Sequence, residues 1–426
     1  MISSMITKLK FFARQRPLLL AAFILEHLWL VWQGVRGVGE PMGDIIHAYH
    51  PWVRQMLASH TLMGINTPWV YPYPDLVFMF VPHFTAFGDY QRAWLYMGGF
   101  IDLAAVLVLL YWPRRYDVAR VRAGWFWLLS QLLLGPVSIS RLDSISIAIA
   151  VIGLVAWLRS KPATAALWFT IATWVKVWPI TLLAATIAEA RRWKPAAILA
   201  AAVGGGILII GVVMGGVKNS LSFVLEQTVR GIQIESPWAT PWLWLRIGHV
   251  KTADIYYSLA LKTFQVKGQG VLQTSSLLGP AMYLFLALTL WLGWWIIRRG
   301  DIDNIALRNE VFAWTSLAAV LDMIVFNKVG SPQYYGWLIV PAILGLIERV
   351  PDWRIVAYWL AGILALTGFI YPDIYGHILR SQQWATGVLT LRNLATVMLL
   401  AFAVARMIEL ALKQLREKRA NQVLLN

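Results

Sequence analysis

The sequence contains no cysteine and few charged residues, and both absences restrict what the protein can be. Without cysteine, disulfides and cysteine-ligated metal sites are excluded. Charged residues make up 14% of the chain, whereas a soluble domain carries about 25%. Hydrophobic residues account for 59% of the 426 positions. This balance predicts a polytopic membrane protein.

Several motifs of soluble enzymes are also missing. The sequence has no G-x-x-x-x-G-K-[ST], no G-x-G-x-x-G in a strand–helix context and no H-E-x-x-H. Nucleotide-driven transport and zinc proteolysis are therefore unsupported. No convincing internal repeat divides the chain, so we treat residues 1–426 as one membrane domain.

Apolar runs recur along the whole chain and predict an all-α protein of about twelve transmembrane helices. The first run contains Glu26 and His27 and precedes no small-residue cleavage site, so it is not an obvious signal peptide. The apolar segment 76–88 is brief, and we expect a half-helix at the outer surface. The predicted spans lie near residues 17–34, 93–112, 123–137, 144–158, 163–176, 178–190, 196–214, 276–297, 310–326, 335–348, 355–371 and 387–410.

The formal net charge of +16 has a topological explanation. Of the 37 basic residues, 23 fall in short clusters that alternate with the spans. The positive-inside rule then predicts both termini in the cytoplasm and two long outer loops, 35–92 and 215–275. Anionic lipid, rather than nucleic acid, is the partner that this charge favours. The clusters lie at 8–16, 114–122, 159–161, 191–194, 298–308, 349–354 and 406–419.

Segments with candidate chemistry all fall on the predicted outer side, although they are distant in the chain. Loops as long as 35–92 and 215–275 are usually functional. The active surface is therefore expected to be extracytoplasmic. The segments are Asp44, WVYPYPD (69–75), SRLD (140–143), Lys176, ESPW (235–238) and NKVGSPQYY (327–335).

The first outer loop supplies a possible base and an aromatic wall. Asp44 in a partly desolvated pocket suits a general base, and the alternative is a solvated or helix-capping aspartate. Two prolines make WVYPYPD stiff and extended, which places Tyr71 and Tyr73 on the same side of it. Aromatic rings with hydroxyls suit sugars or lipid headgroups, and the alternative is an ordinary interfacial turn.

Lys176 lies at the end of an apolar helix, three residues before Pro179. A cation near the membrane needs a partner, so a lipid phosphate is one interpretation and snorkelling to the outer interface is the other. Arg141 and Asp143 either pair with each other or take part in chemistry.

Two further groups of polar residues have no single interpretation. In NKVGSPQYY, Gly330 and Pro332 force a turn at the outer end of a span. Its polar side chains, which packing alone does not explain, are Lys328, Gln333, Tyr334 and Tyr335. Four titratable residues lie within spans, where functional sites and helix–helix hydrogen bonds are equal alternatives: Glu26, His27, Asp102 and Asp322.

Together these motifs resemble the polyprenol-phosphate-mannose-dependent mannosyltransferases, which are class-C glycosyltransferases of bacterial envelopes. The family pattern has a Gly-Asp pair, here Gly43-Asp44, and then a tyrosine-proline signature before a half-helix, here VYPYPDLVFMFVP. A later run ends in lysine and proline, here ATWVKVWP, and NKVGSPQYYGW is similar to a late outer loop of mannosyltransferases that build glycolipid anchors. Two departures stand out: Asp75 replaces a second proline, and Ser-Arg-Leu-Asp replaces Gly-Gln-x-Asn.

The resemblance implies a class-C fold that transfers mannose from a polyprenyl phosphate to a glycolipid or lipoglycan by a single inverting displacement. It makes Asp44 the base and assigns Lys176, with Arg141 or Lys328, to the donor phosphate. It assigns sugar and acceptor binding to six residues: Tyr71, Tyr73, Glu235, Gln333, Tyr334 and Tyr335. The resemblance implies a location in the plasma membrane and no cofactor, and it leaves a requirement for a divalent cation open.

Three other functions compete with this one. A transporter or flippase for a lipid-linked sugar predicts inverted repeats and a site at the membrane midplane, whereas this sequence concentrates polar groups at outer ends. Within the enzyme class, the alternative is a transferase that takes another sugar, such as arabinofuranose or glucose, from its prenyl phosphate. A non-catalytic assembly partner is the third alternative. The acceptor, the linkage and the oligomeric state are left open.

Overall fold

The computed structural model describes residues 15–37, 39–85, 88–112, 117–225, 231–259 and 262–425. Five members of the predicted basic clusters lie outside these residues: Lys8, Lys10, Arg14, Arg114 and Arg115. Within the described residues the chain is helical apart from its loops and one two-stranded hairpin.

The longer helices follow one another through the chain with short connections, except at the two long loops. Their bounds are α2 (Arg16–Arg36), α3 (His50–Ser59), α4 (Asp75–Thr85), α5 (Tyr90–Tyr111), α6 (Val118–Leu134), α7 (Leu142–Leu158), α8 (Pro162–Val175), α9 (Ile180–Glu189), α10 (Trp193–Val213), α12 (Thr240–Ile247), α13 (Val271–Arg299), α14 (Ile305–Val325), α15 (Ile339–Glu348), α16 (Trp353–Gly368) and α18 (Gln383–Leu425).

Short elements occupy the loops between these helices. The strands β1 (Asp254–Ser258) and β2 (Thr263–Lys267) pair antiparallel, with Ile255 opposite Val266. The short helices are η1 (Ile45–Tyr49), η2 (Gly135–Ser138), α11 (Ser222–Leu225), η3 (Pro237–Ala239), η4 (Pro332–Leu338), η5 (Phe369–Ile374) and α17 (Tyr375–Leu379).

Each of the twelve predicted spans coincides with a helix, and the all-α membrane class is confirmed in this coarse form. Among the described residues, six helices are long and apolar enough to cross a membrane: α2, α5, α10, α13, α18 and the stretch from α16 through α17. Of the other six, α14 carries Arg308, Glu310 and Asp322, and the rest have 17 or fewer residues. The predicted half-helix is α4, whose 11 residues span only about 16 Å.

Several helix starts follow from local sequence. Pro17 and Pro162 lie in the first turns of α2 and α8, where a missing N–H costs nothing. The Asp89 carboxylate accepts from the Arg92 N–H at the start of α5, and Asn304 accepts from Leu307 at the start of α14. These caps fix where the helices begin, and hence which side chains belong to the loops that precede them.

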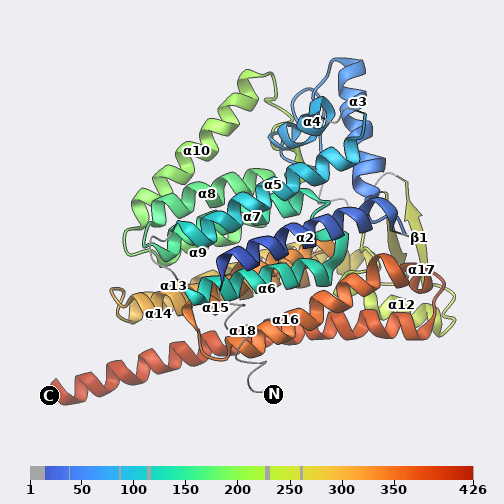
Figure 1. The fold of residues 1–426 in the computed structure, drawn as a ribbon. Coiled ribbons are helices and arrows are strands. Elements are labelled where there is room, and N and C mark those ends of the chain that lie inside the picture. The colour runs from blue at the N-terminus through green and yellow to red at the C-terminus, as the bar shows by residue number, and fades with distance from the viewer. Residues whose placement is uncertain are drawn as a thin grey trace, which may run out of the picture.

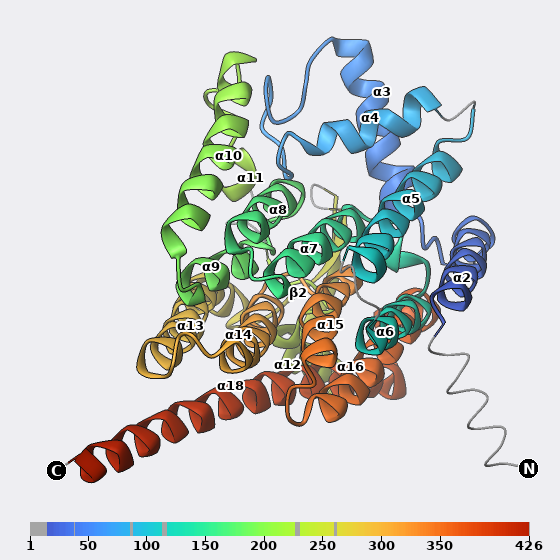
Figure 2. The same cartoon turned by 60° about the vertical axis from the view of Figure 1, so that its left-hand side comes forward.

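The core of the bundle is formed by helices that are buried on every side. Nearly all residues of α7 are buried, and so is every residue of α14 from Val311 to Val325, as expected for helical segments that are apolar almost all round. In the views of Figure 1 and Figure 2, α7 lies between α5 and α8, and α14 lies between α13 and α15. In contrast, α10 leans away from the bundle, and it is covered only toward α8 and α9 and near its end, where Tyr73 and Ser220 lie against Gly211.

Short elements from both long loops gather at one end of the bundle, where α2 ends and α18 begins (Figure 1). A second apolar cluster holds this end together. Ile234 precedes η3, Val266 lies on β2, and Ile374 and Leu389 come from the last part of the chain. This end positions the polar segments that the sequence analysis selected.

Candidate functional site

Asp44, in the first long loop, forms an ion pair with Arg141, at the start of α7. The distance from Arg141 Nε to Asp44 Oδ2 is 3.1 Å. The Arg141 side chain is 4% exposed, whereas that of Asp44 is 39% exposed, so the pair has one buried end and one end facing out. Asp44 precedes η1 but makes no side-chain capping hydrogen bond to it. The capping alternative is therefore wrong.

Lys176 pairs with Asp143, which lies in the first turn of α7. Lys176 Nζ lies 3.4 Å from Asp143 Oδ2 and 4.3 Å from the centre of the Tyr71 ring. The other carboxylate oxygen, Asp143 Oδ1, accepts a 2.8 Å hydrogen bond from Trp337 Nε1. Lys176 is 13% exposed and turns inward, so it does not snorkel to an interface.

The predicted alternative of an Arg141–Asp143 pair is wrong for a geometric reason. Arg141 has extended backbone at the start of α7, and Asp143 is in its first turn. Side chains two residues apart do not face each other on a helix. Each residue therefore pairs with a different segment: Arg141 with the first loop and Asp143 with the end of α8.

Tyr71 and Tyr73 do not line a common wall. The Tyr71 ring meets the edges of Trp69, Trp52 and Tyr49, at centroid distances of 5.5, 6.0 and 6.3 Å, and covers Lys176. The Tyr73 hydroxyl instead donates to the Ile207 carbonyl of α10. The prediction that both rings lie on the same side of the segment is wrong. Tyr71 lines the Lys176 cluster, and Tyr73 fastens the loop to α10.

Asp75 is a site residue that the sequence analysis did not select. Its side chain is fully buried at the start of α4, and neither carboxylate oxygen has a hydrogen-bond partner among the described residues. Burial raises the pKa of Asp75 well above its ordinary value, against the opposing influence of the Lys176 ammonium. The sequence offered one signal that could have identified Asp75, because it stands at a position where proline was expected.

The later loops form one unit around Glu235. The Gln233 side chain donates to Glu235 Oε2 at 2.7 Å, and the Gln233 N–H donates to the Lys328 carbonyl at 2.9 Å. A side chain at Gly330 would collide with the backbone of Glu235 and Ser236, so only glycine fits. Lys328 joins the group through its backbone, and burial lowers the pKa of its ammonium.

Arg392 of α18 ties this unit to the last helix, and sequence reasoning missed it. Its Nη2 donates to the Glu235 carbonyl at 2.8 Å, and its guanidinium lies 4.4 Å from the centre of the Tyr335 ring. Arg392 and Tyr335 are both buried. An arginine within a predicted span was the signal that could have identified it.

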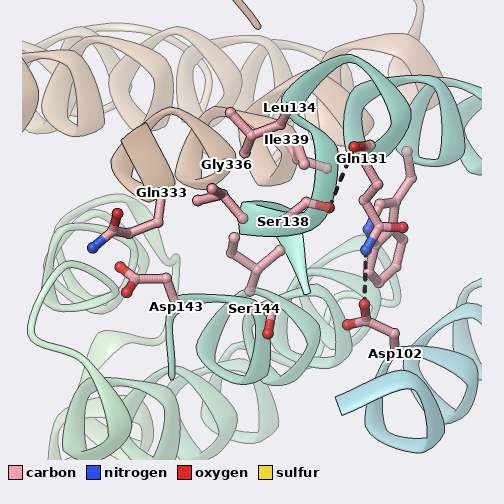
Figure 3. A pocket seen from close by; sticks show the side chains of 12 residues that line it. Asp102, Gln131, Leu134, Ser138, Asp143, Ser144, Gln333, Gly336 and Ile339 are labelled. Carbon is pink, nitrogen blue, oxygen red and sulfur yellow. Dashed lines mark hydrogen bonds between the residues drawn. The ribbon is translucent and has the colours of Figure 1, made fainter. Parts of the chain in front are cut away.

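Tyr334 and Gln333 lie on the Lys176 side of η4. The Tyr334 ring stacks on Trp337 at 4.2 Å, and Trp337 in turn holds Asp143. Gln333 points toward Asp143 across a small cavity of about 10 Å³ (Figure 3). The predicted acceptor residues thus fall into two places, with Gln333 and Tyr334 beside the cations and Tyr335 buried against Arg392.

The far side of this cavity leads to the titratable residues within the spans. Gln131 and Asp102 line it opposite Asp143, and Gln131 Nε2 donates to Asp102 Oδ2 at 2.7 Å (Figure 3). His27 Nε2 lies 3.4 Å from the same oxygen and its Nδ1 lies 3.6 Å from Glu26 Oε2. These contacts join α2, α5 and α6 and provide the predicted helix–helix hydrogen bonds.

Asp322 makes a similar contact elsewhere in the bundle. Its Oδ2 accepts a 2.7 Å hydrogen bond from Thr289 Oγ1, which joins α14 to α13. Among the described residues, no group of three or more His, Asp or Glu side chains could hold a metal ion.

The arrangement as a whole suits a ligand that is anionic at one point and ring-shaped at another. Arg141 is a buried cation and Lys176 a largely buried one, and Arg141 Nη1 has no hydrogen-bond acceptor in the described part of the chain. Tyr71 and two tryptophans form an aromatic group beside Lys176. Neither the protein-family models nor the curated proteins contain a match to this chain.

Glu235 predicts a pH-dependent stability for the late loops. Burial raises its pKa to about 7. Between the ordinary value near 4.3 and this one, the folded state holds a proton that the unfolded state has released, so stability falls as pH rises. We expect Glu235→Gln to raise the melting temperature more at about pH 8 than at about pH 5. A difference in melting temperature that stays the same at both pH values would contradict a raised pKa of Glu235.

Proposed function

We propose that this protein is an integral membrane glycosyltransferase of the class-C type. In this proposal it transfers mannose from a polyprenyl-phosphate donor to a glycolipid or lipoglycan at the outer face of the plasma membrane. The observation that carries the proposal is a pair of cations, the buried Arg141 and the largely buried Lys176, of which Arg141 pairs with the Asp44 carboxylate and Lys176 lies against the Tyr71 ring. The order of the motifs along the chain supports the same assignment.

Asp44 is the proposed base. An inverting displacement needs one group that removes a proton from the acceptor hydroxyl as its oxygen attacks the anomeric carbon. Asp44 is the more exposed partner of its ion pair, so an acceptor can reach it. A donor phosphate would compete for Arg141, because guanidinium groups bind phosphate through paired hydrogen bonds. That competition would release the carboxylate only when donor is present.

Lys176 and Arg141 are the proposed phosphate-binding groups. The leaving polyprenyl phosphate gains negative charge as the glycosidic bond breaks, and fixed cations in a partly desolvated site stabilise it. Tyr71 and its tryptophan neighbours supply an apolar face for the sugar. Gln333 and Tyr334 lie beside this group, whereas Glu235 and Tyr335 support it from the neighbouring loops.

A transporter or flippase for lipid-linked sugars is the second candidate. The observation that favours it is the chain of buried polar groups from Asp143 through Gln131 and Asp102 to His27. Such residues within spans are typical of transport pathways. Transfer of another sugar, arabinofuranose or glucose, is a variant of the first candidate. Product formation in detergent separates the two classes, because transport requires a sealed membrane.

Replacement of the proposed base gives the direct test of the reaction. Asp44→Asn keeps the size of the side chain but cannot accept the acceptor proton, so we expect transfer from polyprenyl-phosphate mannose to fall at least 100-fold. Asp89→Asn is the matched control, since Asp89 caps α5 and pairs with Arg92 at an exposed position. The assay measures labelled glycolipid formed by purified protein. Undiminished turnover in a folded Asp44→Asn variant would exclude this base.

The orientation in the membrane is tested by single cysteines, because the chain has none of its own. We propose twelve crossings with both termini in the cytoplasm, which places Lys251 outside and Lys413 inside. Both residues are exposed. An impermeant thiol reagent added to intact cells should label Lys251→Cys and leave Lys413→Cys unlabelled until the cells are opened. The reverse pattern would invalidate this orientation.

A further inference from the structure

Among the described residues, Asp75 is a buried acid without a hydrogen-bond partner, and its carboxylate interacts electrostatically with the Lys176 ammonium of the proposed phosphate site. Buried polar groups in native proteins are almost always hydrogen-bonded, and an exception needs an explanation. Both Asp75 oxygens lack a partner among the described residues, and the side chain is 0% exposed. The family that the chain resembles often has proline here, so Asp75 is not part of the pattern on which the proposed function rests.

Charge counting shows why the protonation of Asp75 matters. Lys176 is the cation and Asp143, 3.4 Å away, is its paired carboxylate. With Asp75 neutral, these three groups have no net charge, so the occupied site carries only the charge of the ligand, which is one for a phosphate diester and about two for a monoester above its second pKa near 6. With Asp75 ionised, the same anion would have to enter a site that is already negative, at low dielectric where repulsion is strong.

The charged groups that act on Asp75 come from two other elements. The Lys176 ammonium favours its ionised form and the Asp143 carboxylate opposes it. Tyr71, on the preceding loop, reaches the same cluster through Lys176. These opposing influences surround a group whose burial favours the neutral acid.

Other titratable groups on the packed helices are occupied elsewhere. The helices α3 and α5 pack against α4. His50 of α3 lies near His83, in the last turn of α4, and Arg54 acts on His50 there. On α5, Arg92 pairs with the capping Asp89 and Asp102 bonds Gln131.

We propose that the anion site at Lys176 is proton-linked through Asp75, so that an anionic phosphate ester binds only while Asp75 carries its proton. Asp75 acts through Lys176 and is a positioning residue rather than a group that touches the ligand. The inference rests on the proposed function only for the identity of the anion as a lipid phosphate. Above the pKa of Asp75, the affinity should fall by up to tenfold per pH unit.

The test measures binding and does not require turnover. Farnesyl phosphate is titrated into the full-length protein in detergent between about pH 7 and pH 10, above the second phosphate pKa near 6 and below the ordinary lysine pKa near 10.4. Inorganic phosphate and farnesol separate recognition of the phosphate from recognition of the lipid. We expect farnesyl phosphate to bind more weakly as pH rises, and farnesol binding to be unaffected.

Asp75→Asn is the deciding variant because its amide imitates the neutral acid. It should bind farnesyl phosphate as tightly as the unmodified protein at about pH 7 and keep that affinity at about pH 10. Asp89→Asn is the matched control and should retain the pH dependence. The same pH profile in Asp75→Asn as in the unmodified protein, or loss of binding by folded Asp75→Asn at about pH 7, would overturn the inference.

A measurement on the unmodified protein keeps the inference testable if Asp75→Asn does not fold. Calorimetric titration at about pH 9 in two buffers of different ionisation enthalpy reports the protons taken up per anion bound, expected between zero and one. No proton uptake, or no pH dependence of binding up to about pH 10, would refute the linkage. Proton-linked binding without sugar transfer would support this inference and reject the proposed transferase. Sugar transfer without proton-linked binding would support the transferase and reject this inference.

Discussion

The burial of two cations at one end of the bundle is the constraint on which the rest of the site depends. A buried charge is costly unless an opposite charge and hydrogen bonds compensate it. Arg141 and Lys176 meet this requirement with carboxylates from different parts of the chain, Asp44 from the first loop and Asp143 from α7. The first long loop is therefore fixed to the helical core by electrostatics, and the aromatic segment that contains Tyr71 comes to lie over Lys176 as a consequence.

The later loops complete the site through contacts that depend on the same end of α7. Trp337 bonds Asp143, which places η4 beside Lys176. Gly330 lets this segment pack on the backbone around Glu235, and Arg392 links both to α18. The site is thus assembled from loops and helix ends that are distant in the sequence, while the helices supply the apolar body. This division suits an enzyme that handles a lipid-linked sugar at a membrane surface.

The sequence predicted the helices and the set of site segments better than it predicted their contacts. Hydropathy sufficed for the spans, because a membrane helix must be apolar over its length. The pairing of Arg141 with Asp143 and the common wall of Tyr71 and Tyr73 were wrong, because each depends on which segment packs opposite. Asp75 could be noticed as unusual, but its isolation from hydrogen-bond partners is visible only once α4 is placed against its neighbours.

The central claim is that this site transfers a sugar from a lipid phosphate, and one assay tests it most directly. Purified protein is incubated in detergent with labelled polyprenyl-phosphate mannose and envelope glycolipids, and the product is identified by mass spectrometry. Our account predicts a glycolipid that has gained one mannose with inverted anomeric configuration, and release of polyprenyl phosphate. The absence of product from this and other polyprenyl-phosphate sugars, with protein that binds farnesyl phosphate, would contradict it.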